Sequence, residues 1–563
     1  MTDLRNPTRR ETMAGAVAIG LAASSLRSSI ATAQTSVLTA RGLVYDAAKV
    51  AQGAKAETVG LPGVLVSNGR DIVRTDQDGR YALAVADEDI IFVVKPAGYA
   101  LPHDADNIPR FSYIHHPSGT PPELALRYRG IAPTGPMPAS IDFGLTPRFE
   151  PDAFEAILFT DPQPESPIEL GHVRDTAVAR VLGTSAAFGI TTGDILFDDL
   201  SFYGRSNRII GRIGVPWFHI GGNHDLNFEA ADARYSRETF KQVFGAPYYA
   251  FHHGKALFLM LDNVHYLGAA SGKGDGIGRY EGRIGERQLA FIANVLTETP
   301  RDRLVVVAMH IPLFTDLDPN DPRQNTTDRD ALLALLEGRR VVSIAGHTHT
   351  TEHHYPRDSH HHHVLTAVSG SWWSGPSVRT GIPSADSRDG TPNGFHMLSI
   401  DGDRYVTRYR SAQGEPDEAM RIMLESQFRG GAAEVLKEYR PTQTLRSPIA
   451  LESVPATDLV VNVFDGGPKT RVAYTIGDGE AIPMTRRRRP DPFVAELFLR
   501  YPDTRKPWVK AEPSSHIWTA RLPETLLAGT HCITVRVRDE YDRPLQSSML
   551  IEVLAGSERA PRG

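Results

Sequence analysis

The chain of 563 residues has a single cysteine, Cys532, so an internal disulfide is impossible. Cys532 lies in an alternating apolar run, and we expect it to be a small buried side chain. Basic residues are not in excess, since 61 Lys and Arg stand against 67 Asp and Glu, a net charge of −6. Nucleic-acid-binding proteins usually present a basic face, so we expect no nucleic-acid partner. The one basic run, Arg486–Arg489, precedes Pro490 and is interpreted as a solvated loop.

Long hydrophobic runs are also lacking. A membrane-spanning helix needs about 20 apolar residues, and no stretch reaches that length, so no transmembrane segment is expected. The N-terminus instead resembles an export signal over residues 1–33: Arg9-Arg10 precede a short apolar stretch, and Ala31-Thr32-Ala33 offers a cleavage site. The arginine pair is similar to a twin-arginine signal. Thr12 and Met13 depart from that motif, so the Sec route stays open. We expect a periplasmic or secreted protein.

Five short clusters of polar residues each follow an apolar, β-branched run. Such runs are typical of buried strands. Open α/β sheets gather their sites at the carboxyl ends of strands, so we expect the clusters to meet in space. In chain order they are Asp161-Pro162-Gln163, Gly193-Asp194, Gly222-Asn223-His224-Asp225, His310 and Gly346-His347-Thr348-His349.

Carboxylate, amide and imidazole groups suit Mn, Fe or Zn. Two such cations about 3.5–4 Å apart can activate a shared water and stabilise displacement at phosphorus. Taken singly, each cluster has a structural explanation as a turn, a helix cap or a buried histidine. All five in order favour a site for two divalent metal ions.

The order of these clusters resembles the calcineurin-like metallophosphoesterase family, with motifs D-x-H, G-D, G-N-H-[DE], H and G-H-x-H. The resemblance implies that His224 protonates the leaving oxygen and that Asp225 orients its ring. It also implies attack by a hydroxide that bridges the metals. The implied metal ligands are Asp161, Gln163 and His349 for one ion, Asn223, His310 and His347 for the other, and Asp194 for both.

Gln163 stands where the general family motif has a histidine. A branch of the family carries D-P-Q, which favours Gln163 as a neutral ligand and Mn or Fe over Zn. The alternative is a weakened first metal site.

The predicted fold is α/β: a metallophosphoesterase double-sheet sandwich flanked by helices over residues 150–410. Helix-like periodicity covers 173–188, 202–213, 286–296 and 328–336. Residues 36–130 resemble a carboxypeptidase regulatory-like β-sandwich. Residues 430–556 resemble the β-rich C-terminal domain of one family subset, and residues 425–438 are expected to be a helical link.

Three further residues are candidates for substrate contact. Trp372 and Trp373 lie in a loop that resembles a signature of the same subset, and an indole can stack on a substrate group. Core packing is the alternative for at least one of them. Asn393 is a third candidate, although such residues are more often found in turns.

The histidine-rich segments His353-His354 and His360–His363 lack ordered ligand spacing. We interpret them as a solvated hairpin loop, and His252-His253 in the same way.

The sequence thus predicts an exported phosphoesterase that acts on a small phosphorylated substrate, either a monoester or a diester. The alternative is a non-catalytic envelope module with a vestigial metal site, because β domains on both flanks favour binding or assembly.

Overall fold

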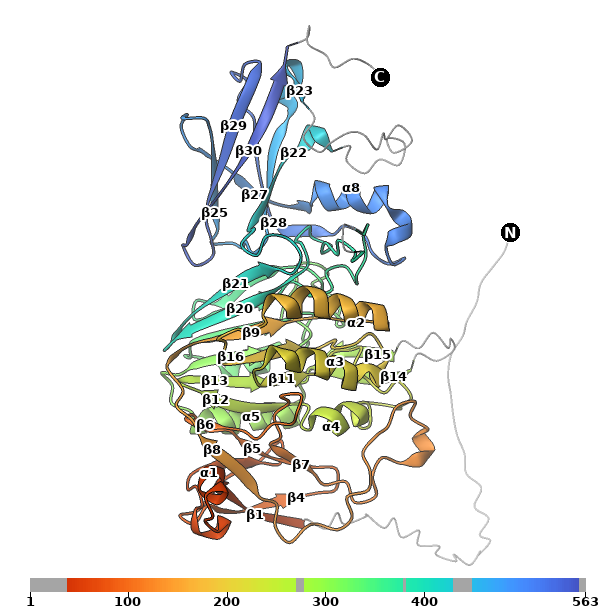
Figure 1. Ribbon diagram of the computed structural model, residues 1–563, viewed down its shortest axis with the longest axis vertical. Coiled ribbons are helices and arrows are strands. Elements are labelled where there is room, and N and C mark those ends of the chain that lie inside the picture. The colour runs from red at the N-terminus through yellow and green to blue at the C-terminus, as the bar shows by residue number, and fades with distance from the viewer. Residues whose placement is uncertain (1–37, 270–277, 378–380, 429–447, 556–563) are drawn as a thin grey trace, which may run out of the picture. The chain divides into compact units, whose positions relative to one another are not determined.

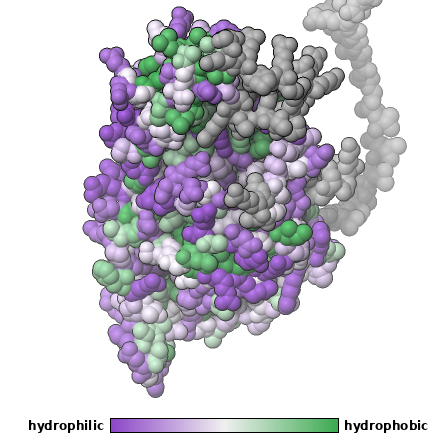
Figure 2. All heavy atoms as spheres, turned by 45° about the horizontal axis from the view of Figure 1, so that its top comes forward, coloured by the Kyte–Doolittle hydropathy of each residue, from purple (hydrophilic) through white to green (hydrophobic). Residues whose placement is uncertain are grey.

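The structure, a computed structural model, describes residues 38–269, 278–377, 381–428 and 448–555 (Figure 1). The predicted export signal lies outside these residues, as does most of the predicted helical link. Within the described part, no helix is long and apolar enough to cross a membrane. The face drawn in Figure 2 is a mosaic of hydrophilic and hydrophobic residues.

The N-terminal domain consists of two four-stranded sheets, ordered β4-β1-β8-β6 and β3-β2-β5-β7. β4 shows why strands form here, since its side chains alternate between exposed and buried. β8 pairs with β1, so the domain extends past the predicted limit at residue 130. Its elements are β1 (Leu38–Asp46), α1 (Ala47–Ala51), η1 (Ala56–Thr58), β2 (Leu65–Ser67), β3 (Ile72–Arg74), β4 (Arg80–Val85), β5 (Ile90–Val94), β6 (Tyr99–Ala100), β7 (Ser112–Ile114), η2 (Pro122–Leu124) and β8 (Phe143–Pro147).

The central domain has a five-stranded sheet, β11-β10-β9-β20-β21, and a six-stranded sheet, β12-β13-β16-β17-β19-β18. With its helices it confirms the predicted α/β double-sheet class. Its strands are β9 (Ala153–Phe159), β10 (Phe188–Thr192), β11 (Trp217–Ile220), β12 (Tyr249–His253), β13 (Ala256–Met260), β14 (Val264–Ala269), β15 (Gly278–Gly282), β16 (Leu304–Ala308), β17 (Val341–Ala345), β18 (Glu352–Arg357), β19 (His360–Val364), β20 (Gly394–Asp401) and β21 (Arg404–Ser411).

Parallel pairing places the predicted ligands at one edge of each sheet. β9, β10 and β11 are parallel neighbours, and so are β16 and β17. Every residue of β10, β16 and β17 is buried, as expected for strands covered on both faces. All five ligand clusters therefore follow the carboxyl ends of parallel strands.

Four helical stretches lie at the predicted segments, but α4 was not predicted and the first segment needs a correction. The first was predicted at 173–188, but it starts earlier because Ser166 caps it, accepting from the Glu169 N–H at 3.2 Å, with Pro167 in the first turn. The helical elements are α2 (Pro167–Val173), η3 (Arg174–Val178), η4 (Leu200–Phe202), α3 (Tyr203–Ile210), η5 (Gly211–Ile213), α4 (Glu238–Phe244), α5 (Glu286–Glu298) and α6 (Arg329–Leu335).

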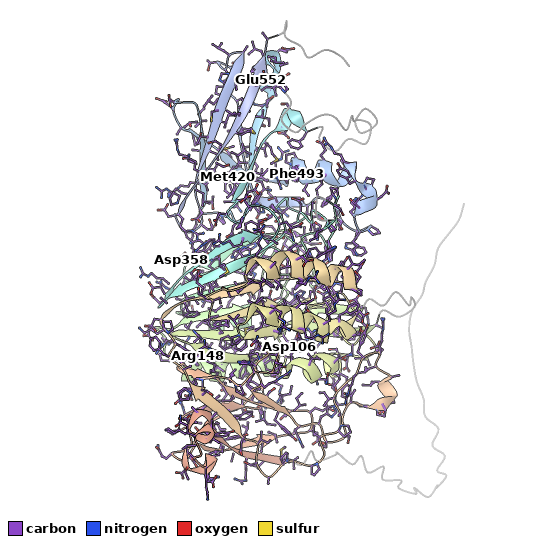
Figure 3. The ribbon with its side chains drawn as sticks, in the orientation of Figure 1. Asp106, Arg148, Asp358, Met420, Phe493 and Glu552 are labelled. Carbon is purple, nitrogen blue, oxygen red and sulfur yellow. The ribbon has the colours of Figure 1, made fainter. Side chains whose placement is uncertain are left out.

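The histidine-rich segments are not a solvated loop. β18 and β19 form a hairpin whose turn contains Asp358, labelled in Figure 3, and every residue of β19 is buried between β17 and β18. His253 in β12 is buried as well. The prediction was wrong because imidazoles that find polar partners can occupy a sheet interior, which composition alone does not reveal.

The C-terminal domain pairs a four-stranded sheet, β22-β24-β28-β27, with a five-stranded one, β23-β30-β29-β25-β26. It begins with β22, before the predicted limit at residue 430. Its elements are β22 (Met420–Leu424), η6 (Glu425–Gln427), β23 (Ile449–Ala450), η7 (Leu451–Ala456), β24 (Asp458–Val463), β25 (Arg471–Ile476), β26 (Ile482–Pro483), β27 (Thr485–Pro490), α8 (Pro492–Arg500), η8 (Pro502–Thr504), β28 (Pro513–Arg521), β29 (Gly529–Arg538) and β30 (Pro544–Leu554).

Two predictions for this domain were wrong. Arg486–Arg489 are part of the edge strand β27, where charged side chains discourage further strand pairing. Cys532 is exposed, because the alternation along β29 turns it away from the core while Ile533 points inward.

Candidate metal centre

The backbone at the ends of the parallel strands is unusual. Asp161, Gln163, Asp194, His347 and His349 all have positive φ, between 39° and 74°. Residues with a Cβ rarely adopt this conformation, and it persists only where the surrounding structure enforces it. Five of the seven predicted ligands share it, so the strained backbone points to one functional site.

Four of the predicted ligands already lie within reach of one cation. Nε2 of His310 lies 3.0 Å from Oδ1 of Asn223 and 3.3 Å from Oδ2 of Asp194. Nδ1 of His347 lies 3.1 Å from the same His310 nitrogen. Each ring is oriented from its other side, because His310 Nδ1 is 3.0 Å from the Thr192 carbonyl and His347 Nε2 is 2.9 Å from that of Arg323.

The other predicted ligands form a second group, which also reaches Asp194. Nε2 of Gln163 donates to Oδ2 of Asp194 at 2.5 Å, and Nε2 of His349 lies 3.7 Å from Oδ1 of Asp161. The His349 ring is oriented through Nδ1, which bonds to the Gly370 carbonyl. The backbone N–H of His347 donates to both oxygens of Asp161 at 3.0 Å. Oδ2 of Asp194 thus contacts both sets, one through Gln163 and the other through His310.

Unpaired polar atoms test whether these residues fit metal ions. Oε1 of Gln163 and Nε2 of His349 are buried and have no hydrogen-bond partner. Leaving such atoms unpaired in the interior costs about 1–3 kcal/mol each. Both are electron-pair donors, so a bound cation would satisfy them. The donor set therefore fits two divalent ions.

Burial and neighbouring charges set the protonation of the centre. Burial raises the pKa of Asp161 to about 7. Burial acts the same way on Asp194, but His310 and His224 outweigh it and hold the pKa of that carboxyl below its usual range. Burial lowers the pKa of His347 and of His349 to about 3, so both rings are neutral, the form that binds metal.

His224 stands beside Asp194 but is oriented by a residue that the sequence did not single out. The backbone N–H of His224 donates to Oδ1 of Asp194 at 2.9 Å. The ring nitrogen Nδ1 lies 2.7 Å from Oδ1 of Asp198. A carboxylate can only accept, so the ring donates. Burial opposes the charged imidazole, yet Asp194 and Asp198 outweigh it and raise the pKa of His224 to about 9.

The prediction that Asp225 orients the His224 ring was wrong. Its fully buried carboxylate accepts from the Tyr203 hydroxyl at 2.9 Å and from the N–H groups of Gly222 at 2.9 Å and Ile195 at 3.1 Å. Asp225 therefore fixes the loops around the centre. Sequence adjacency to His224 was misleading because consecutive side chains in a turn point in different directions.

The three candidate substrate contacts are divided by the structure. Trp372 is half-buried and stacks on His349 with ring centroids 3.8 Å apart, at the edge of the centre. Trp373 is buried and donates to the Pro162 carbonyl at 2.9 Å. Asn393 is fully buried and bonds to the Val368 carbonyl and to Gln413. Trp373 and Asn393 are therefore structural, and only Trp372 can meet a substrate.

Two aromatic residues near His224 were missed. Phe197 stacks on the His224 ring with centroids 4.4 Å apart. Trp508 of the C-terminal domain stacks on Phe197, with ring centroids 6.0 Å apart and an angle of 11° between the ring planes. Trp508 is 49% exposed. Phe197 and Asp198 come shortly after the Gly193-Asp194 cluster, separated from it by Ile195 and Leu196, a signal that was available. Nothing in the sequence could have placed Trp508 here.

Comparison with solved structures finds distant likenesses, and no curated protein matches the chain. A dimetal phosphatase from Danio rerio is 18% identical, over 47% of this chain and 98% of that one, with a TM-score of 0.33. Purple acid phosphatase PPD1 from yellow lupin (Lupinus luteus) seeds is 12% identical, over 62% and 67%, with a TM-score of 0.34. The 5'-nucleotidase of Candida albicans is 14% identical, over 47% and 53%, with a TM-score of 0.25. Such low scores carry no argument about substrate or mechanism.

Comparison with family profiles is decisive. The calcineurin-like phosphoesterase profile matches residues 177–351, which contain most of the predicted ligands. The profile for the N-terminal region of calcineurin-like phosphoesterases matches residues 48–125, and that for the C-terminal region matches residues 362–544. The three matches together cover most of the chain. The chain belongs to the calcineurin-like phosphoesterase family and is a phosphate-ester hydrolase.

Proposed function

We propose that this protein is an exported phosphatase or phosphodiesterase whose substrate carries an apolar, flat leaving group. One observation carries the catalytic part of the proposal. Oδ2 of Asp194 contacts both sets of predicted metal ligands, through His310 and through Gln163. Oδ1 of the same carboxylate accepts from the backbone N–H of His224, whose ring faces Asp198. Metal ligands and a proton donor are thus fixed to one another through a single side chain.

The chain's residues would divide the reaction as follows. Two divalent cations, when bound, would lower the pKa of a shared water and stabilise negative charge on the phosphate oxygens. His224 would give its proton to the leaving oxygen. Asp198 would keep the Nδ1 proton and ring orientation fixed, so that Nε2 faces the substrate. Asp161, Gln163 and His349 would hold one cation, and Asn223, His310 and His347 the other.

The surroundings of His224 support a particular leaving group. Phe197 covers one face of the imidazole, and Trp508 continues that aromatic surface into solvent. Trp372 meets Trp508 edge to face at 6.2 Å. A group that departs next to His224 would therefore lie against aromatic rings. Rings favour flat apolar partners through stacking, so aryl or heteroaryl phosphate esters fit this surface best.

Export rests on the sequence of the N-terminus. The paired Arg9 and Arg10, the short apolar stretch and the Ala31-Thr32-Ala33 site support passage by the twin-arginine route. Fractionation of cells that express the full chain tests this. Accumulation of the mature protein outside the cytoplasm, lost in an Arg9→Lys/Arg10→Lys variant, is expected. Equal export by both chains would favour the Sec route.

The first test of activity compares p-nitrophenyl phosphate with bis-(p-nitrophenyl) phosphate, with Mn²⁺ added. We expect turnover of at least one ester and its loss, by about 1,000-fold or more, in Asp194→Asn. The ratio of the two rates separates monoesterase from diesterase. No turnover with Mn²⁺, Fe²⁺, Zn²⁺ or Co²⁺ in a folded wild-type protein would favour the non-catalytic envelope module.

A further inference from the structure

A second cluster of metal-binding side chains lies outside the catalytic centre. Three histidines from the central domain, His353 in β18, His363 in β19 and His396 in β20, surround Asp465, which follows β24 of the C-terminal domain. Their Nε2 atoms lie 3.2, 3.0 and 3.3 Å from the same oxygen, Oδ1 of Asp465. All three imidazoles are fully buried, and the Asp465 side chain is 15% exposed.

These separations match the edges of a small coordination polyhedron. With metal–nitrogen and metal–oxygen distances of about 2.0–2.2 Å, ligand atoms of a tetrahedral zinc ion lie about 3.3–3.5 Å apart. The observed separations fall within a few tenths of an ångström of that range. The three edges that meet at Asp465 Oδ1 therefore need only a slight expansion to hold a cation.

Hydrogen bonding alone leaves this cluster incomplete. Nε2 of His363 is only 3.0 Å from Asp465 Oδ1, yet it is buried without a hydrogen bond of ordinary geometry. Nδ1 of His396 is buried without a partner as well. Buried polar atoms are almost always satisfied, so the unpaired Nε2 of His363, which faces the carboxylate, points to an additional bound group.

The second nitrogen of two of these rings has a partner. Nδ1 of His353 lies 2.8 Å from Nε2 of His361, whose own Nδ1 lies 3.1 Å from the Tyr405 hydroxyl. Nδ1 of His363 lies 3.1 Å from Oγ1 of Thr407. Such contacts hold the proton on Nδ1 and leave the Nε2 lone pair for a metal, as outer-shell groups do around zinc.

We propose that His353, His363, His396 and Asp465 bind a structural zinc-class cation. The site goes beyond the proposed function, since it shares no ligand with the catalytic centre. Three ligands come from the central domain and one from the C-terminal domain, so the ion would fasten Asp465 to β18, β19 and β20. Four protein ligands with no open position are typical of a structural rather than a catalytic zinc.

The test measures metal content in a background without catalytic metal. The full chain with Asp194→Asn and His310→Ala, purified through a tag without histidines, is supplied with ZnCl₂, passed through a desalting column and analysed by plasma mass spectrometry. We expect about one zinc per chain. Adding His363→Gln and Asp465→Asn should abolish it. His360→Gln is the matched control, since this buried histidine of the same strand bonds to Ser343 and does not touch Asp465.

A second measurement does not depend on folding of the variants. Wild-type crystals grown with zinc are examined by anomalous scattering at the zinc edge. A peak between the Asp465 carboxylate and the three Nε2 atoms, separate from any at Asp194, supports the proposal. No peak there, or equal zinc content with and without the His363→Gln and Asp465→Asn changes, overturns it. Because neither readout measures turnover, failure here is distinguishable from failure of the proposed function.

Discussion

Asp198 lies 2.7 Å from Nδ1 of His224, whereas the adjacent Asp225 bonds elsewhere. The two carboxylates therefore have separate tasks: Asp198 governs the orientation and charge of the imidazole, and Asp225 fixes the surrounding loops. Substitutions at the two positions should fail in different ways.

Replacing Asp198 should affect proton transfer. His224 owes part of its raised pKa, about 9, to Asp198, so Asp198→Asn lowers that pKa and depletes the protonated form at alkaline pH. We expect kcat to fall about 10- to 100-fold and the alkaline limb of kcat/KM to move to lower pH. The pH–rate profile measures this. Asp199→Asn, a neighbour that bonds to Ser201, is the control. An unmoved alkaline limb would show that Asp198 does not act through His224.

Replacing Asp225 should affect stability instead. The buried carboxylate accepts three hydrogen bonds, one of them from Tyr203. In Asp225→Asn an NH₂ group replaces one acceptor oxygen and then faces another donor. We therefore expect a loss of about 1–3 kcal/mol in the free energy of unfolding. The alkaline limb of the pH–rate profile should stay in place. Denaturant titration gives the first quantity, and Tyr203→Phe should reproduce part of the loss. Undiminished stability would contradict this role.

Gln163 should determine which metal the first site prefers. Its amide oxygen is a neutral, harder ligand than imidazole, so Gln163→His should keep activity while moving the preference from Mn²⁺ or Fe²⁺ toward Zn²⁺. Activity of the metal-free protein titrated with each ion measures the order of preference. An unchanged order, or a protein with either residue that cannot bind two metals, would remove Gln163 from the ligand set.

Trp508 should recognise the leaving group. If the aromatic surface over Phe197 binds it, Trp508→Ala should lower kcat/KM for an aryl phosphate about 10-fold, an amount that corresponds to about 1.4 kcal/mol. An alkyl phosphate should respond little. Trp508→Phe should retain most of the rate, and Tyr501→Ala, another exposed aromatic of the same segment, is the matched control. Equal losses for both esters would exclude leaving-group recognition.

Glu150 should govern acid stability. Its buried carboxylate contacts Lys95 at 2.6 Å and His253 at 3.2 Å. Burial by itself would raise the pKa of Glu150, but the contacts with His253 and Lys95 outweigh it and lower that pKa to about 2. A carboxyl whose pKa is lowered in the folded state stabilises the fold at pH values above its ordinary pKa near 4.5. This contribution disappears as the pH falls toward 2. Its upper limit is about 3 kcal/mol.

Denaturant titrations between pH 6 and pH 2 measure this contribution. Glu150→Gln should be less stable at pH 6 and show a flatter decline on acidification. Asp152→Asn, which removes an exposed ion pair with Lys255, should leave the slope unchanged. A slope that is the same with and without Glu150 would assign acid sensitivity to other groups.

The sequence alone determined the chemistry of the catalytic centre. Ligand types and their order along the chain are local properties. Each cluster also follows a strand that can be recognised from its apolar run alone. Because carboxyl ends of parallel strands meet at one edge, order in the chain was enough to predict proximity in space for Asp161, Asp194, His310 and His347.

Only the tertiary structure decided which side chains face one another. Asp198 rather than Asp225 orients His224, since turn geometry sets direction independently of adjacency. Burial of the histidine-rich hairpin is tolerable in part because Asp465, about a hundred residues later in the chain, supplies a hydrogen-bond partner for His353. Trp508 likewise reaches Phe197 only through domain packing. Such pairings depend on contacts between distant segments, which composition and periodicity do not encode.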